Sequence, residues 1–144
     1  MSLCIYARIQ NECLKQEVLD KGIHDYFSPQ YKIMQNKNMQ EISYKIANEH
    51  NDVIISFVQK KAAPYNVYDS DIIGDEFKFL QLIIFDMNKE TSSTAEYKEI
   101  IKFCRYLKEK INSCILITSD MHDEICYLKE NKIIWSDDKE KIFS

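Results

Sequence analysis

Residues 113–135 read SCILITSDMHDEICYLKENKIIW, and this stretch decides the fold. It contains three short apolar, β-branched runs at residues 113–119, 124–128 and 133–135, with polar or acidic residues between them. Such runs, bounded by turn-forming residues, are typical of β-strands. The stretch therefore predicts three strands, the last two of which pair as a hairpin around residues 129–132.

Outward from this stretch, four further segments carry clear periodicity. Residues 94–111 place apolar side chains at helical spacing, which predicts an amphipathic helix. Residues 53–59 (VIISFVQ) and 77–85 (FKFLQLIIF) are nearly continuous apolar runs, which predicts two neighbouring central strands buried on both faces. Residues 3–10 (LCIYARIQ) alternate with a period of two, which indicates a half-buried strand.

The remaining segments have weaker patterns. Residues 11–22 predict a short helix that ends at its lysine-glycine pair, and residues 38–50 predict another helix behind a capping residue. Between them, residues 23–37 predict a loop, or a weak strand around residues 31–34. Residues 136–144 predict a surface tail.

Together these elements predict an α+β fold. We expect a single mixed, mostly antiparallel sheet of about five to six strands, with about three helices packed mainly on one face. The 144 residues have the length of one ordinary domain, and no internal repeat or linker divides them. We therefore expect one domain over residues 1–144.

Composition excludes several classes of function. The only two glycines, Gly22 and Gly74, lie far apart, whereas phosphate-binding loops need clustered glycines. Because 23 acids outnumber 19 bases, attraction to nucleic acid is disfavoured. The five cysteines are odd in number and form no C-x-x-C pair, so we expect reduced thiols. With no expected export signal or membrane span, these features predict a cytoplasmic protein.

The strongest candidate for a binding site lies between the two predicted central strands, where residues 60–76 predict a long hairpin connection. Residues 65–76 hold four acids and no Lys or Arg, together with tyrosines and isoleucines. Such a mixture of anchors and charges suits a protein interface. A solvated loop is the alternative, since exposed acids are expected on a protein with a pI near 5.4. With a second acidic group, the candidate partner-binding residues are Tyr65, Tyr68, Asp69, Asp71, Asp75, Glu76, Asp120, Asp123 and Glu124.

Two other classes of function are open on the residues alone. Asp86, Asp120 and His122 lie at or after strand ends, and such a set could hold Mg²⁺ or Zn²⁺ in a metal-dependent hydrolase. No second motif defines a ligand geometry, so we expect no metal, no cofactor and no catalysis. A general interaction or oligomerisation module would instead associate through an exposed sheet edge near Trp135.

The layout resembles small immunity proteins of bacterial contact-dependent growth inhibition and related polymorphic toxin systems, including a swarming-inhibition immunity type. The resemblance implies a non-catalytic protein that binds and neutralises one toxin domain, often a nuclease. From the residues themselves we expect no membrane, nucleic-acid or small-molecule partner. The family's binding surface does not carry over residue by residue. Since nucleases carry basic clefts, our own hypothesis from charge is that the acidic residues 69–76, with or without Asp120, Asp123 and Glu124, meet a basic toxin surface. The likeness is carried by LCIYARIQ, VIISFVQ, FKFLQLIIFD, STAEYKEIIKFCRYLKEK and especially SCILITSDMHDEICYLKENKIIW.

Overall fold

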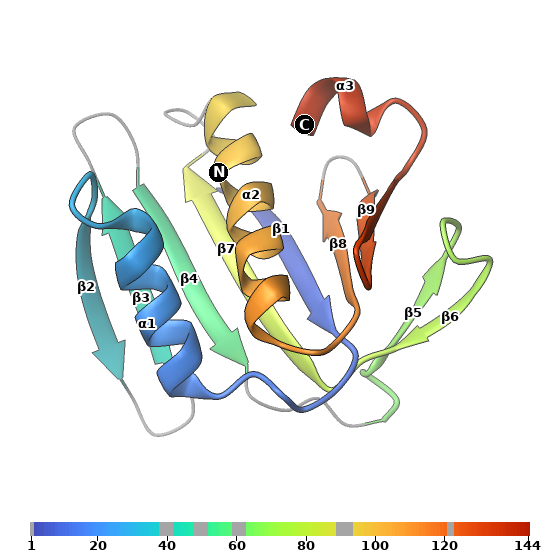
Figure 1. The fold of residues 1–144 in the computed structure, drawn as a ribbon, viewed down its shortest axis with the longest axis horizontal. Coiled ribbons are helices and arrows are strands. Elements are labelled where there is room, and N and C mark those ends of the chain that lie inside the picture. The colour runs from blue at the N-terminus through green and yellow to red at the C-terminus, as the bar shows by residue number, and fades with distance from the viewer. Residues whose placement is uncertain (1, 38–41, 48–51, 59–62, 89–93, 121–122) are drawn as a thin grey trace.

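The computed structural model describes residues 2–37, 42–47, 52–58, 63–88, 94–120 and 123–144. In chain order its elements are β1 (Ser2–Ile9), α1 (Gln16–Phe27), β2 (Lys32–Lys37), β3 (Ile42–Ala47), β4 (Asp52–Val58), β5 (Val67–Ser70), β6 (Asp75–Lys78), β7 (Gln81–Asn88), α2 (Thr94–Lys110), β8 (Ile115–Ser119), β9 (Asp123–Lys129), β10 (Lys132–Trp135) and α3 (Lys139–Phe143). Eight strands form one sheet in the order β10-β9-β8-β1-β7-β4-β3-β2, and β5 and β6 form a separate two-stranded hairpin (Figure 1).

The α+β class and the antiparallel character of the sheet are confirmed, and every strand pair in the described part of the chain is antiparallel. The two apolar runs predicted to be neighbours do pair, as β4 and β7, with Ile55 opposite Phe85. The sheet is larger than predicted, because β2 and β3 add two strands at one edge. The predicted strand at residues 77–85 is also divided, since Phe79 and Leu80 separate β6 from β7.

The predicted helix at residues 38–50 is wrong where the structure describes it. Ile42–Ala47 is the strand β3, in which Tyr44 and Ile46 are buried while Lys45 between them is exposed. In so short a segment the apolar residues fit either a helical or a strand period. Pairing with β2 on one side and β4 on the other favours the strand. Residues 38–41 and 48–51 lie outside the described residues.

The helix predicted at residues 11–22 begins and ends about one turn later than expected. α1 runs from Gln16 to Phe27 and continues through Gly22, which is buried in the middle of the helix. A Cβ at this position would lie 3.2 Å from Leu107 of α2. Gly22 is therefore explained by the close approach of the two helices rather than by a helix end.

Strand alternation divides the apolar residues between two cores, one on each face of the sheet. Residues such as Ile83 and Phe85 face the main core, which includes buried residues of α1, α2 and α3. Leu82 and Leu116 face the opposite way and pack under the β5–β6 hairpin with Phe77 and Phe79. No helix in the described ranges is long and apolar enough to cross a membrane.

The predicted surface tail at residues 136–144 is wrong. It contains the short helix α3, and Phe143 is 2% exposed. The Phe143 ring lies 6.4 Å from the ring of Tyr97 on α2. The C-terminus therefore belongs to the main core.

Replacing Phe143 with Ala should lower the free energy of unfolding by about 3 kcal/mol, because a buried aromatic ring is lost. Urea denaturation measures this change. Lys141→Ala is the matched control, since Lys141 is exposed on the same helix. Equal unfolding midpoints for the two variants would contradict the docking of α3.

Tyr44→Phe should reduce the loss of stability at alkaline pH. Burial, with a further contribution from the charge of Asp20, raises the pKa of Tyr44 to about 12, whereas a tyrosine in an unfolded chain has a pKa of about 10. The folded state therefore keeps a proton that the unfolded state loses. Tyr44 lowers the free energy of unfolding as pH rises from about 10 to about 12 and has no such effect below that range.

At neutral pH the same variant should be no less stable than the parent. The Tyr44 hydroxyl is buried and has no well-formed hydrogen bond among the described residues, although the side chains of Gln16 and Asp20 lie close enough to influence its pKa, so its removal breaks no well-formed bond. Urea unfolding at neutral and alkaline pH tests both statements. Tyr65→Phe, at a position that is 77% exposed, is the control and should leave the alkaline loss unchanged.

Candidate functional site

The predicted acidic segment is a β-hairpin that projects beside the main sheet (Figure 1). β5 pairs with β6 so that Asp69 lies opposite Glu76 and Ser70 lies opposite Asp75. Gly74 lies in the turn with a φ of 78°. A residue with a side chain would be strained in this backbone conformation, which explains the glycine. The acids Asp69, Asp71, Asp75 and Glu76 are exposed and line a hollow of about 330 Å³ at the tip.

A buried carboxylate anchors this tip to the main sheet. Glu124 on β9 is 6% exposed, and its Oε2 accepts a hydrogen bond from Ser70 Oγ at 2.7 Å. The backbone N–H of Asp71 donates to Oε1, and that of Ile72 donates to Oε2 at 3.4 Å. The sequence predicts Glu124 as a partner contact, whereas the structure places it inside the protein. There it holds the turn that presents the acids.

A β-bulge explains why Glu124 faces the hairpin. Ile117 of β8 pairs with Cys126, but the next residue, Thr118, pairs with Glu124, so one residue of β9 is extra. Both Ile125 and Cys126 can therefore enter the main core while Glu124 faces the opposite side. Strict alternation would place Glu124 on the same face as Cys126.

Arg8 provides a second connection between the hairpin and the sheet. Its guanidinium lies 4.5 Å from the ring centre of Tyr68 on β5, 5.3 Å from Tyr6 and 5.5 Å from Phe79. It also donates a hydrogen bond to Thr118 Oγ1. Burial lowers the pKa of Arg8, and the two tyrosines oppose this shift. A guanidinium stays charged in proteins, so the rings face a cation. Tyr68 was predicted to contact a partner, but its ring makes a cation–π contact with Arg8 inside the protein.

The remaining predicted partner-binding residues are Tyr65, Asp120 and Asp123, and of these Tyr65 and Asp120 do not line the hollow at the hairpin tip. Tyr65 is 77% exposed before β5, where it is accessible to a partner. Asp120 is exposed, but its carboxylate accepts hydrogen bonds from the Tyr6 hydroxyl at 3.0 Å and the Cys4 N–H at 3.2 Å. The side chain of Asp123 lies outside the described part of the chain. Asp120 is therefore attached to β1 and is separate from the hollow at the hairpin tip.

The metal alternative gains no support from the geometry. Asp86 lies opposite Cys4 in the β1–β7 pair, and the carboxylate of Asp120 accepts a hydrogen bond from the backbone N–H of Cys4. Burial, followed by the charge of Asp86, raises the pKa of the Cys4 thiol, which makes it a weaker ligand. His122 falls outside the described residues, and among those described no group of three or more His, Cys, Asp or Glu could hold a metal ion.

Sequence reasoning missed the two groups that hold the hairpin in place. Arg8 alternates with apolar residues in β1, and a charge at a half-buried strand position is a signal that it needs a partner. Nothing in the local sequence identifies Glu124 as a buried charge that needs a partner, because the direction of its side chain depends on the bulge against β8.

Comparison with known proteins found no protein-family model, no curated protein and no solved structure that matches the chain.

Glu124→Gln should loosen the hairpin without unfolding the protein. The amide NH₂ cannot accept the hydrogen bonds that a carboxylate oxygen accepts, so at least one donor of the turn is left unpaired. We expect a loss of about 1–3 kcal/mol in the free energy of unfolding and faster hydrogen exchange at the amides of Asp71 and Ile72. Glu76→Gln removes a similar charge at an exposed position of the same hairpin and is the control. Unchanged exchange at these amides would disprove the anchoring role.

Proposed function

We propose that this protein is an immunity-type inhibitor that binds and neutralises a toxin domain with a basic surface. It forms a tight protein complex and catalyses no reaction. The observation that carries the proposal is the group of four exposed acids around one hollow on a hairpin that is held to the sheet from behind. None of these four acids has an ion pair within the described part of the chain.

The anchoring of the hairpin supports tight binding. Ordering a flexible loop upon association costs free energy that a loop already held in place does not lose. The turn is held by the hydrogen bonds to Glu124, and the base is held by the aromatic contacts of Arg8 and the second core. The acids therefore keep one arrangement before a partner arrives.

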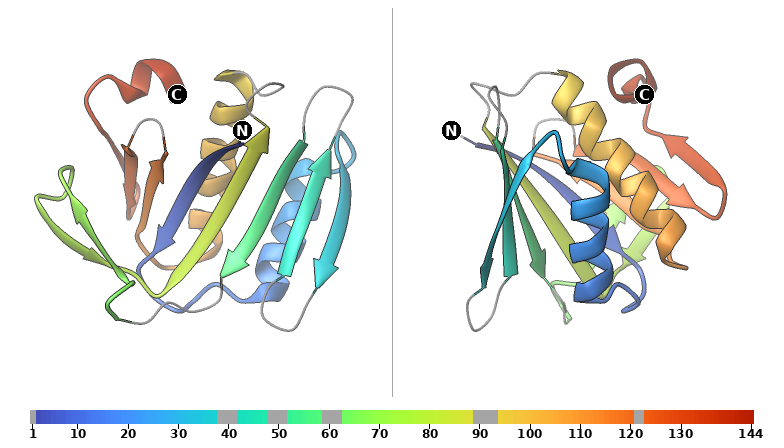
Figure 2. Two further views of the ribbon diagram at one scale, coloured as in Figure 1. Left: turned by 180° about the vertical axis from the view of Figure 1, so that it is seen from behind. Right: turned by 60° about the vertical axis from the view of Figure 1, so that its left-hand side comes forward.

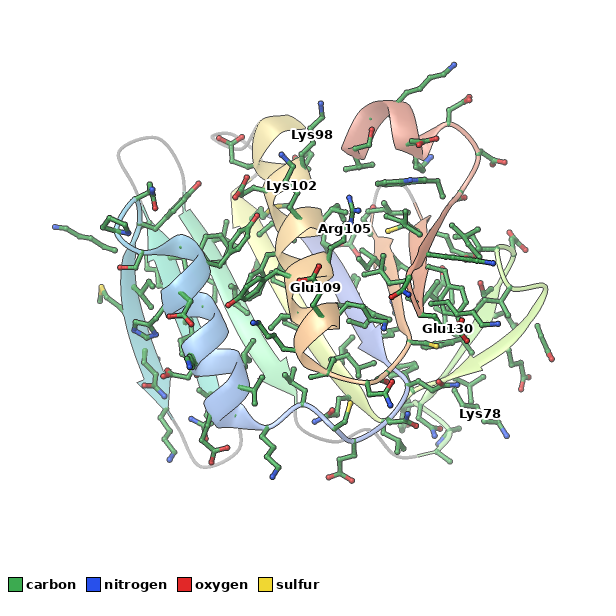
Figure 3. The ribbon with its side chains drawn as sticks, viewed as in Figure 1. Lys78, Lys98, Lys102, Arg105, Glu109 and Glu130 are labelled. Atoms are coloured by element: carbon green, nitrogen blue, oxygen red, sulfur yellow. The ribbon has the colours of Figure 1, made fainter. Side chains whose placement is uncertain are left out.

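The distribution of charge supports a basic partner. Lys78 lies at the end of β6 away from the acidic tip, and the basic residues Lys98, Lys102 and Arg105 lie on α2, on the helical side (Figure 3). Segregated charge steers a complementary surface during diffusion and repels a like-charged one. Toxin domains that cleave nucleic acids need basic clefts, so they fit this requirement.

The resemblance to immunity proteins supports the same assignment, and we propose a cytoplasmic location with it. The five cysteines are free thiols, as a reducing compartment requires. We assign a protein as the partner, with no cofactor, no nucleic acid and no small-molecule substrate. Exposed Tyr65, next to the acids, is the aromatic contact that we expect at this interface.

Reversing three acids tests the proposal. The proposed partner to be tested is the C-terminal domain encoded by the reading frame upstream of this gene, which is co-expressed with the tagged protein and titrated by calorimetry. Asp69→Lys, Asp71→Lys and Asp75→Lys together should weaken a one-to-one complex about 100-fold or more, because like charges would then meet at the interface. The variant should also fail to protect cells from the toxin domain.

The matched control reverses three exposed acids outside the hairpin, namely Glu12, Asp25 and Glu109. It changes the net charge by the same amount and should leave affinity within a few fold. Equal affinity for the hairpin variant and the parent would exclude the hairpin as the contact. Absence of any complex, with undiminished toxicity, would exclude the immunity function itself.

A further inference from the structure

Half of one sheet face has no covering layer in the described structure. The helices α1 and α2 cover the other face, and the β5–β6 hairpin packs on the strands β7, β1, β8 and β9. No described helix or strand lies over the outer side of β2, β3 and β4 (Figure 2, left). We call this surface the open half-face, and its members used below are Lys32, Met34, Lys45 and Ile54.

The open half-face exposes apolar side chains among lysines. Met34 is 65% exposed and Ile54 is 42% exposed, and Lys45 lies between them in register across the three strands. Lys32 is exposed two residues before Met34, and therefore on the same side of β2. Large exposed apolar side chains grouped on one face are typical of an interaction surface.

The hairpin has the complementary properties. It carries the exposed acids Asp69, Asp71, Asp75 and Glu76, and Tyr65 beside it is 77% exposed. Hairpin and open half-face lie at opposite ends of the same side of the sheet (Figure 2, left). Each molecule therefore carries an acidic, aromatic surface and, facing the same way, an apolar surface that bears two lysines and ends beside Asp86, which pairs with Ile54.

We propose that the open half-face docks the hairpin of a second copy of this chain. In this dimer the sheet faces that lack helices meet each other, and the twofold axis between them runs parallel to the strands. Each hairpin then lies over the open half-face of the other copy. Both contacts are then made at once, and the assembly closes as a dimer. Burying about 800 Å² on each copy would use roughly a tenth of its 8551 Å² surface, which is usual for a specific dimer.

Pairing through the free edge of β2 is a weaker alternative. Two β2 strands paired antiparallel and centred on each other would bring Lys32 of one copy opposite Lys37 of the other. Like charges directly opposite each other destabilise a strand pair, and lysines protect sheet edges from this association. The inference does not depend on the identity of the toxin. It does require that a partner at the hairpin and the second copy exclude each other.

Sedimentation of the full chain at about 100 μM and about 20 mM salt tests the dimer. We expect twice the mass of 17.1 kDa, falling to the monomer at about 500 mM salt. Lys32→Glu with Lys45→Glu should give a monomer, and so should Asp69→Lys with Asp75→Lys. An equimolar mixture of these two variants should regain the dimer, because each interface of the mixed pair joins opposite charges.

Lys102→Glu with Arg105→Glu is the matched control for net charge. Both residues are exposed on α2, on the helical side of the molecule (Figure 3), so this variant should stay dimeric. A parent that is monomeric at low salt overturns the proposal. A dimer that survives Lys32→Glu with Lys45→Glu, or a mixture that stays monomeric, overturns it as well, and neither result bears on toxin binding.

Discussion

A negative charge buried inside a protein must be compensated, and the side chain of Glu124 is under this constraint. Its carboxylate is 6% exposed and is compensated by a hydroxyl and two backbone N–H groups of one turn. Those groups belong to a hairpin more than 50 residues away in sequence, so the charge can be buried only if the hairpin packs against the sheet. The position of the acidic tip thus depends on an interaction made behind it.

The secondary structure of a segment could be predicted from the sequence where the segment's own periodicity determines it, but not where contacts with distant segments determine it. α2 and the strands β8 to β10 have strong local periodicity, and their structures agree with the prediction. β3 is different, since its apolar residues fit two periods and only pairing with β2 and β4 selects the strand. Phe143 likewise gives no local signal of burial, because the partner that covers it is a distant helix.

The candidate site divides in the same way. The exposure of Asp69, Asp71, Asp75 and Glu76 follows from their charge, so composition alone identified them. The inward role of Glu124 depends on a one-residue shift between β8 and β9, and no pattern within β9 predicts such a shift. Tyr68 was identified as an interface residue by its type, while its contact with Arg8 joins two residues that lie 60 positions apart in the sequence.

The position of β1 has a consequence for how the protein is made. The first strand of the chain lies inside the sheet between β7 and β8, so Ile9 pairs with Gln81 on one side and Ile115 on the other. A nascent chain therefore cannot close this sheet until β8 has left the ribosome, and contacts of such long sequence range form slowly. The strand β1 must remain soluble and unpaired during that delay, and the charge of Arg8 within this apolar segment serves that requirement.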